Sequence, residues 1–133
     1  MFDVIIVSHG RYAEAMLESA EMISGRQEQV KTYGLFPGDS VDEFREKLIE
    51  SIGESLKKGE VLLLSDMQSG SPFNSAVAAM ETLSFRHVAG INLPLLLEIF
   101  GHRKFKNLES VHKMIFELGP ITLVDVNKFL EGI

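Results

Sequence analysis

His9 and Asp66 each stand at the end of a short apolar run of the sequence, and both side chains are suited to chemistry. An imidazole is a nucleophile at neutral pH when one ring nitrogen is unprotonated and an acceptor holds the other. A carboxylate is such an acceptor, and its negative charge stabilises the ring as the free nitrogen gains a substituent. Gly10 leaves room beside the histidine. The pair therefore predicts a nucleophilic His9 whose ring is oriented by Asp66.

An anion-binding loop is predicted shortly after Asp66. Ser69 and Gly70 permit a tight turn with exposed backbone amides. Ser71 and the proline that follows it are typical of the N-cap and first residue of a helix, whose free N–H groups and positive dipole end attract negative charge. The Ser71 hydroxyl adds a further donor. Together with the imidazole, this loop predicts a phosphoryl group carried on His9.

Motifs that bind and cleave ATP are missing: the sequence has no Walker A loop, no kinase glycine-rich signature and no acidic cluster for Mg²⁺. The phosphoryl donor is therefore predicted to be another phosphoprotein, and no metal or organic cofactor is required. Each feature also has a structural interpretation, because single histidines, turn-capping aspartates and serine-proline helix starts are common. The residues by themselves leave both interpretations open.

Apolar residues alternate between strand-like and helix-like spacing along the chain, which predicts an α/β domain. Short apolar runs predict strands over residues 4–7, 30–36, 60–65 and 87–92, and a fifth strand over Ile121–Val126. Helical spacing predicts helices over residues 12–23, 41–56, 72–83, 94–100 and 107–118. Ser40 is placed to cap the second of these helices.

Strands that alternate with helices form a parallel sheet with helices on both faces and right-handed crossovers. We predict a doubly wound, flavodoxin-like domain with strand order 2-1-3-4. Ligands of such sheets lie beyond the C-terminal ends of the strands, where the strand order reverses. Strands 1 and 3 are neighbours in this order. His9 and the loop after Asp66 are therefore expected to open into one crevice.

Length and composition restrict the class of protein. A chain of 133 residues forms one domain, and 13 Lys+Arg against 19 Asp+Glu give a net charge of −6, which disfavours nucleic acid as a partner. The absence of cysteine excludes disulfides and thiol catalysis, and it fits a reducing, cytoplasmic compartment. The apolar runs are too short to cross a membrane, and the start lacks a basic leader.

The other histidines and the basic runs are predicted to be structural or solvated. His87 lies at the start of a predicted strand, His102 in a basic loop and His112 on the polar face of a helix. Lys57-Lys58 is expected to be ordinary solvated charge. Arg103-Lys104-Phe105-Lys106 is expected to be the same, with contact to an acidic partner as a less favoured alternative.

At these same residues the sequence resembles the IIA component of the mannose-type phosphoenolpyruvate-dependent sugar phosphotransferase system (PTS). The resemblance extends over essentially the whole chain, in the family's order and spacing. It is carried by Ile5–Gly10 with Ala13-Glu14, Ala20–Met22, Pro37-Gly38, Leu64–Asp66 with Gly70–Asn74, and Gly90–Glu98.

The resemblance implies a phosphocarrier. The phosphohistidine protein HPr would phosphorylate His9, and His9 would pass the group to a cognate IIB protein or domain, which phosphorylates sugar arriving through a membrane IIC/IID permease. Asp66 would orient the ring, while Ser71 and the amides around Gly70 would face the phosphate. The crevice would be lined by Gly10, Met67, Asn92 and Pro94.

The resemblance further implies a homodimer in which a C-terminal antiparallel strand, matched by Ile121–Val126, is exchanged between subunits. One departure is that Ser69-Gly70 stands where many members have two glycines. Two alternatives remain. One is the same phosphotransfer to a non-transport acceptor, as in dihydroxyacetone kinase subunits or regulatory IIA-like domains. The other is a non-catalytic domain such as a response regulator or flavodoxin, whose acidic cluster or Ser/Thr-rich phosphate loop is missing.

Overall fold

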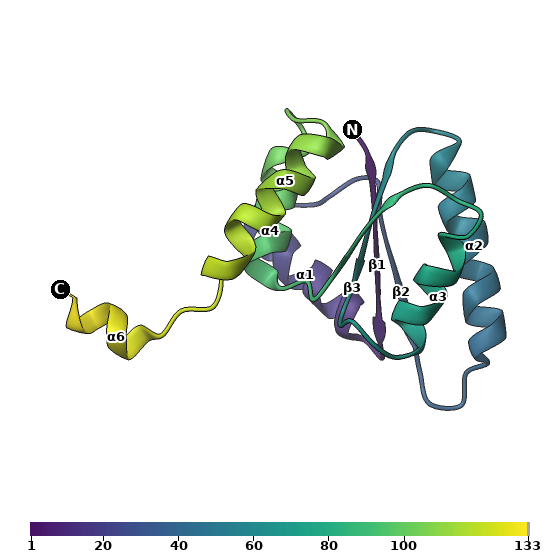
Figure 1. Ribbon diagram of the computed structural model, residues 1–133, viewed down its shortest axis with the longest axis horizontal. Helices are drawn as coiled ribbons and strands as arrows, with labels where there is room; N and C mark the ends of the chain where they lie inside the picture. The colour runs from purple at the N-terminus through teal and green to yellow at the C-terminus, as the bar shows by residue number, and fades with distance from the viewer. Residues whose placement is uncertain (133) are drawn as a thin grey trace.

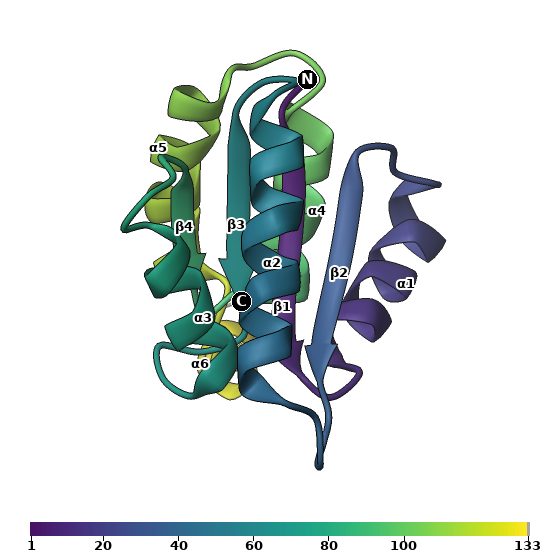
Figure 2. The same ribbon diagram turned by 90° about the vertical axis from the view of Figure 1, so that its right-hand side faces the viewer.

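A four-stranded parallel sheet with strand order β2-β1-β3-β4 forms the centre of the molecule. The computed structural model describes residues 1–132. Helices cover both faces of the sheet, as Figures 1 and 2 show. The predicted fold class and strand order are confirmed. The strands are β1 (Asp3–His9), β2 (Val30–Leu35), β3 (Val61–Ser65) and β4 (Arg86–Ala89). The helices are α1 (Tyr12–Ser24), α2 (Val41–Leu56), α3 (Ser71–Ala79), α4 (Leu93–His102), α5 (Leu108–Leu118), the 3₁₀ turn η1 (Gly119–Ile121) and α6 (Val126–Glu131).

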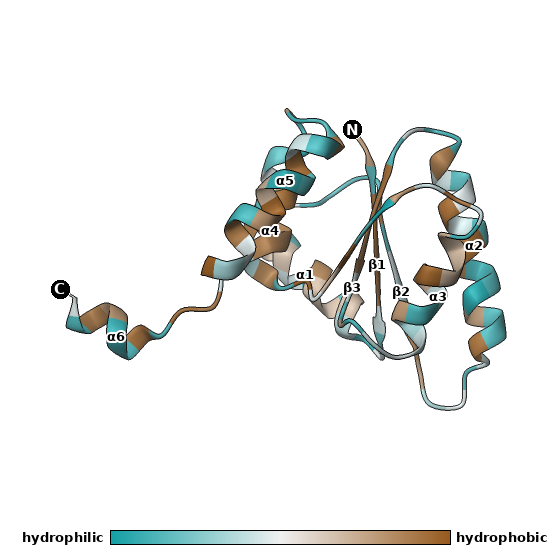
Figure 3. Ribbon diagram, in the orientation of Figure 1, coloured by the Kyte–Doolittle hydropathy of each residue, from teal (hydrophilic) through white to brown (hydrophobic). Residues whose placement is uncertain are grey.

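Two hydrophobic cores hold the layers together, one on each face of the sheet. Val4 and Ile6 of β1 pack with Leu62 and Leu64 of β3 beneath α1, α4 and α5. The alternate residues of the same strands, among them Ile5, pack beneath α2 and α3. Burial on both faces explains why these strands are continuously apolar, which Figure 3 shows as brown strands between two-coloured helices.

The register of β1 against β3 places the predicted site residues at one edge of the sheet. Val7 lies beside Ser65, and the amide of Asp66 continues the ladder by donating to the Val7 carbonyl at 3.1 Å. Both strands run in the same direction and end within two residues of this pair. His9 and Asp66 therefore emerge next to each other beyond the C-terminal ends of β1 and β3.

The strand predicted over Ile121–Val126 does not form within this single chain. Residues up to Ile121 form the turn η1, residues 122–125 are irregular, and α6 begins at Val126. A strand requires a neighbouring strand to pair its N–H and C=O groups. The chain has left the sheet at this point, and Figure 1 shows α6 standing clear of the body, so the segment meets no strand of its own chain.

Arg103 is buried, which corrects the prediction that its basic run is solvated. Its side chain is only 1% exposed and lies over the ring of Phe100, with 5.2 Å between the guanidinium carbon and the ring centroid. The guanidinium donates to the backbone carbonyl of Phe2, just before β1, and to those of Glu28 and Gln29, just before β2. It also donates to the Gln27 side chain. Burial lowers the pKa of this guanidinium.

No helix among residues 1–132 is both long enough and apolar enough to cross a membrane.

Of the predicted helix starts, Ser40 is confirmed as the N-cap of α2, since its hydroxyl accepts from the Glu43 amide at 3.2 Å.

The buried guanidinium leads to a prediction about stability. Arg103→Met keeps the length of the side chain but leaves the carbonyls of Phe2, Glu28 and Gln29 without their shared donor. We expect the free energy of unfolding to fall by about 3 kcal/mol, measured by urea denaturation. The neighbouring Lys104 is exposed, so Lys104→Met is a matched control that should change stability by less than about 0.5 kcal/mol. Equal effects of the two substitutions would contradict the assigned role of Arg103.

Candidate functional site

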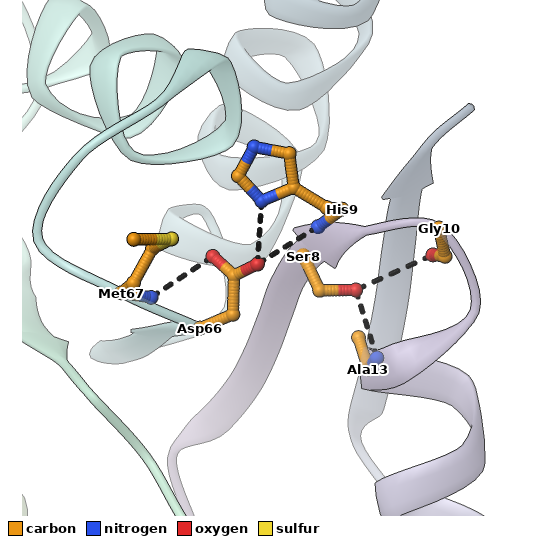
Figure 4. Close-up of polar contacts among 6 residues, drawn as sticks. All are labelled: Ser8, His9, Gly10, Ala13, Asp66 and Met67. Atoms are coloured by element: carbon orange, nitrogen blue, oxygen red, sulfur yellow. Dashed lines mark hydrogen bonds and ion pairs between the residues drawn. The ribbon is translucent and has the colours of Figure 1, made fainter. Parts of the chain in front are cut away.

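The carboxylate of Asp66 holds the main chain and the ring of His9 at the same time. Its Oδ2 accepts from the His9 amide at 2.9 Å and lies 2.7 Å from Nδ1 of the ring, and its Oδ1 accepts from the Met67 amide at 2.9 Å (Figure 4). The Asp66 side chain is 9% exposed, whereas that of His9 is 50% exposed. A fixed, nearly buried carboxylate thus presents an accessible imidazole.

This contact determines the tautomer of His9. A carboxylate oxygen only accepts hydrogen bonds, so the proton of the neutral ring resides on Nδ1. The other nitrogen, Nε2, then carries a lone pair, and Figure 4 shows it on the side of the ring away from Asp66. The arrangement is that of a nucleophile with a built-in orienting group.

Gly70 lies against the free nitrogen of His9. A Cβ added at Gly70 would stand 2.7 Å from both Nε2 and Cε1 of the ring, closer than such atoms approach one another. The residue also has a φ of +90°, which disfavours side chains. Only glycine brings the backbone of this loop so close to the reactive edge of the imidazole.

The helix that follows begins without a side-chain cap. The N-cap of α3 is Gly70, which corrects the expectation that Ser71 takes this place, and Ser71 is instead the first helical residue. The helix ends at Ala79, before the predicted end near Leu83. Pro72 carries no N–H, so the first turn offers the amides of Ser71 and Phe73 without intrahelical acceptors. Together with the positive helix end, these groups can bind an anion beside His9.

The remaining predicted residues lie at the same end of the sheet with different surroundings. Met67 and Ser69 are exposed in the loop after β3. Asn92 caps α4 by accepting from the Leu95 amide at 3.0 Å, and its Nδ2 donates to the Thr122 hydroxyl at 2.8 Å. Both polar atoms of Asn92 are therefore engaged away from His9. Pro94 is exposed in the first turn of α4.

Two residues that support the site were not identified from the sequence. Ser8 is fully buried and its hydroxyl accepts from the Ala13 amide at 2.8 Å, which fixes the start of α1 directly after His9. At Gly34 an added Cβ would stand 2.1 Å from the carbonyl oxygen of Gly10. A glycine inside a strand-like run is a known signal of close backbone approach, so Gly34 could have been found.

His102 and His112 lie on α4 and α5, apart from His9. His102 ends α4, with Nδ1 2.8 Å from the Glu98 carbonyl oxygen. The ring of His112 packs against that of Phe116 of α5 in a tilted arrangement, with 5.0 Å between the ring centroids. Burial and the nearby Arg86 lower the pKa of His112.

Comparisons with known proteins agree on one family. Residues 3–116 match the family described as the PTS system fructose IIA component. The fructose-specific EIIA component of Bacillus subtilis is 30% identical over 126 residues, which cover 89% of this chain and 86% of that protein. The mannose-specific EIIAB component of Escherichia coli is 34% identical over 96 residues, which cover 71% of this chain and 30% of that protein.

A solved structure extends the similarity to three dimensions. The crystal structure of the PTS IIA protein associated with the fucose utilization operon of Streptococcus pneumoniae superposes with a TM-score of 0.84 at 33% identity and covers 97% of each chain. Fold and site thus define an α/β domain that presents a histidine, oriented by an aspartate, beside a helix N-terminus. The chain belongs to the family of mannose-type IIA components of the sugar phosphotransferase system.

The close approach of Gly70 to His9 leads to a prediction. Gly70→Ala should displace the His9 ring because the new methyl group overlaps Nε2, and NMR should show altered imidazole signals for His9. Gly90→Ala is the matched control: Gly90 has a similar φ of +87° but open space around the added Cβ. We expect each substitution to lower the free energy of unfolding by about 1 kcal/mol from backbone strain. Only Gly70→Ala should change the His9 signals, and unchanged signals would contradict the described contact.

Proposed function

We propose that His9 accepts a phosphoryl group from phospho-HPr and transfers it to a cognate IIB protein or domain. The observation that carries the proposal is the ring geometry: Nδ1 lies 2.7 Å from the Asp66 carboxylate, and Nε2 faces Gly70 at the start of α3. This protein is then an intermediate carrier on the cytoplasmic side of the membrane. Its link to the IIC/IID permease is indirect, through IIB.

The chemistry needs only the groups already described. The Nε2 lone pair attacks the phosphorus atom, and the bond between phosphorus and the donor's imidazole nitrogen breaks with its electron pair returning to that nitrogen. The Nδ1 proton stays on His9, and the negative charge of Asp66 stabilises the positive ring. Transfer to IIB is the same displacement with His9 as the leaving group.

The start of α3 supplies the electrostatic part. The transferred group carries its negative charge on oxygen atoms, and the amides of Ser71 and Phe73 with the Ser71 hydroxyl are donors for these oxygens. The helix end remains uncapped by any side chain. Its donors are therefore available to the phosphoryl group.

The names of the relatives support a IIB partner, and they differ in the sugar. The E. coli relative is named an EIIAB component, which combines an A and a B part. Relatives of this chain are named for fructose, mannose and sorbose. A carrier that holds only the phosphoryl group has no need to contact the sugar, so we assign sugar specificity to the partner components.

A labelling experiment tests this function. Incubation with phosphoenolpyruvate, enzyme I and HPr should place one acid-labile phosphoryl group on the protein, detected by intact-mass spectrometry. His9→Ala should abolish the label because the nucleophile is lost. Asp66→Ala should lower the rate of labelling by about a hundredfold, since the ring loses its orientation and the charge that stabilises it.

His112→Ala serves as the matched histidine control and should be labelled at the rate of the wild type. Persistent labelling of His9→Ala would refute the assignment of His9. Wild-type rates in Asp66→Ala would refute the orienting role of Asp66.

We further propose that the C-terminal segment pairs with a second copy of this chain. Beyond α5 the chain carries large apolar side chains that are more than half exposed: Ile121, Leu123, Val124, Val126, Phe129 and Leu130. Figure 1 shows this segment extending away from the core of its own chain. β4 lies at an edge of the sheet (Figure 2) and offers unpaired backbone groups to an added strand. Exchange of these segments would convert residues 121–126 into an antiparallel strand in a homodimer.

Sedimentation equilibrium tests the exchange. The wild type should have twice the mass of one chain, and the double substitution Leu123→Asp, Val126→Asp should give the monomer, because two charges would be buried in the interface. Phe105→Asp is the matched control: Phe105 is 87% exposed at a loop outside this segment and should leave the dimer intact. A monomeric wild type would contradict the proposal.

A further inference from the structure

The imidazole of His87 lies on the face of the sheet that α3 covers, next to the candidate site. Its Nε2 is 2.9 Å from the hydroxyl oxygen of Ser65, the last residue of β3. Ser65 is fully buried. The pair is therefore a polar contact in a largely apolar layer, where an unmade hydrogen bond is costly.

The same ring also touches α3. Its centroid is 5.3 Å from that of Phe73, the third residue of the helix, and 6.5 Å from that of Phe85. Phe73 is one of the two residues whose amides face the anion-binding end. No side chain caps α3, so the placement of its first turn depends on packing against the sheet. His87 of β4 contributes to that packing.

Ser65 connects the ring to the other half of the site. It directly precedes Asp66, and its carbonyl oxygen accepts from the amides of Gly90 and Ile91 at 2.9 and 3.4 Å. A displacement of Ser65 therefore moves the backbone that carries the Asp66 carboxylate. His87 contacts the end of β3 through Nε2 and α3 through the ring of Phe73.

We propose that His87 is a positioning residue, which through Ser65 and Phe73 fixes the distance between the Asp66–His9 pair and the start of α3. The proposal rests on the proposed phosphotransfer at His9. His87 itself accepts no phosphoryl group in this scheme, because its Nε2 is engaged by Ser65. Burial lowers the pKa of His87 and so favours the neutral ring, whose Nε2 pairs with the Ser65 hydroxyl.

Steady-state phosphorylation by phospho-HPr tests this role in three variants. His87→Leu removes the hydrogen bond and the aromatic contact, and we expect kcat to fall about tenfold with KM for phospho-HPr unchanged. His87→Gln places an amide where Nε2 lies and should keep kcat within about threefold of the wild type. Ser65→Ala deletes only the hydroxyl, so it should fold normally and lower kcat in the same direction as His87→Leu.

Exchange of the His9 Nδ1 proton with solvent, followed by NMR, gives a readout that needs no phosphoryl donor. We expect faster exchange in His87→Leu and Ser65→Ala, because Asp66 is less firmly held, and the wild-type rate in His112→Leu.

Wild-type kcat and exchange in Ser65→Ala, or equal losses in His87→Gln and His87→Leu, would overturn the proposal. Failure of the wild type to become phosphorylated would instead overturn the function proposed for His9. In that case the exchange rates still decide whether His87 positions the pair.

Discussion

The parallel pairing of β1 with β3 is the constraint on which the site depends. His9 and Asp66 are 57 residues apart in the sequence. Their side chains come into contact only when the two strands pair. The register that puts Val7 beside Ser65 also brings the carboxylate to the ring. One carboxylate oxygen then receives both the amide and the ring of His9, so strand pairing and ring orientation are parts of the same hydrogen-bond network.

The start of α3 illustrates how stability is exchanged for function. Most helices satisfy their first N–H groups with a side chain, as Ser40 and Asn107 do in this chain. At α3 the N-cap is Gly70, which has no side chain and lies against His9. The helix loses a cap and the backbone adopts a positive φ. In return, backbone N–H donors are open beside the His9 ring, and the neighbouring residues must position a helix end that no side chain caps.

Much of this arrangement could be predicted from the sequence because it depends on local patterns. Alternating periodicity indicates a parallel, doubly wound sheet, and the ends of apolar runs indicate where His9 and Asp66 emerge. Contacts between distant residues leave weaker traces. Arg103 stands among lysines and looks solvated, yet its partners are carbonyls that no side-chain pattern reveals. The segment Ile121–Val126 has the apolar character of a strand, but strand formation needs a neighbour that a single chain does not provide.

The position of Arg103 also has a consequence for biosynthesis. Its contact with the Phe2 carbonyl spans 101 residues, so the residues before β1 gain this contact only after α4 has been synthesised. During synthesis, β2 is the first strand with which β1 can pair. Pairing with β3 follows, and the guanidinium that joins the beginning of β1 to the loop before β2 comes last, at the end of α4. Contacts of such separation form late. The ring of His9 thus meets Asp66 and Gly70 only after the loop beyond β3 has been synthesised, and the strand that carries it is joined to the segment before β2 later still.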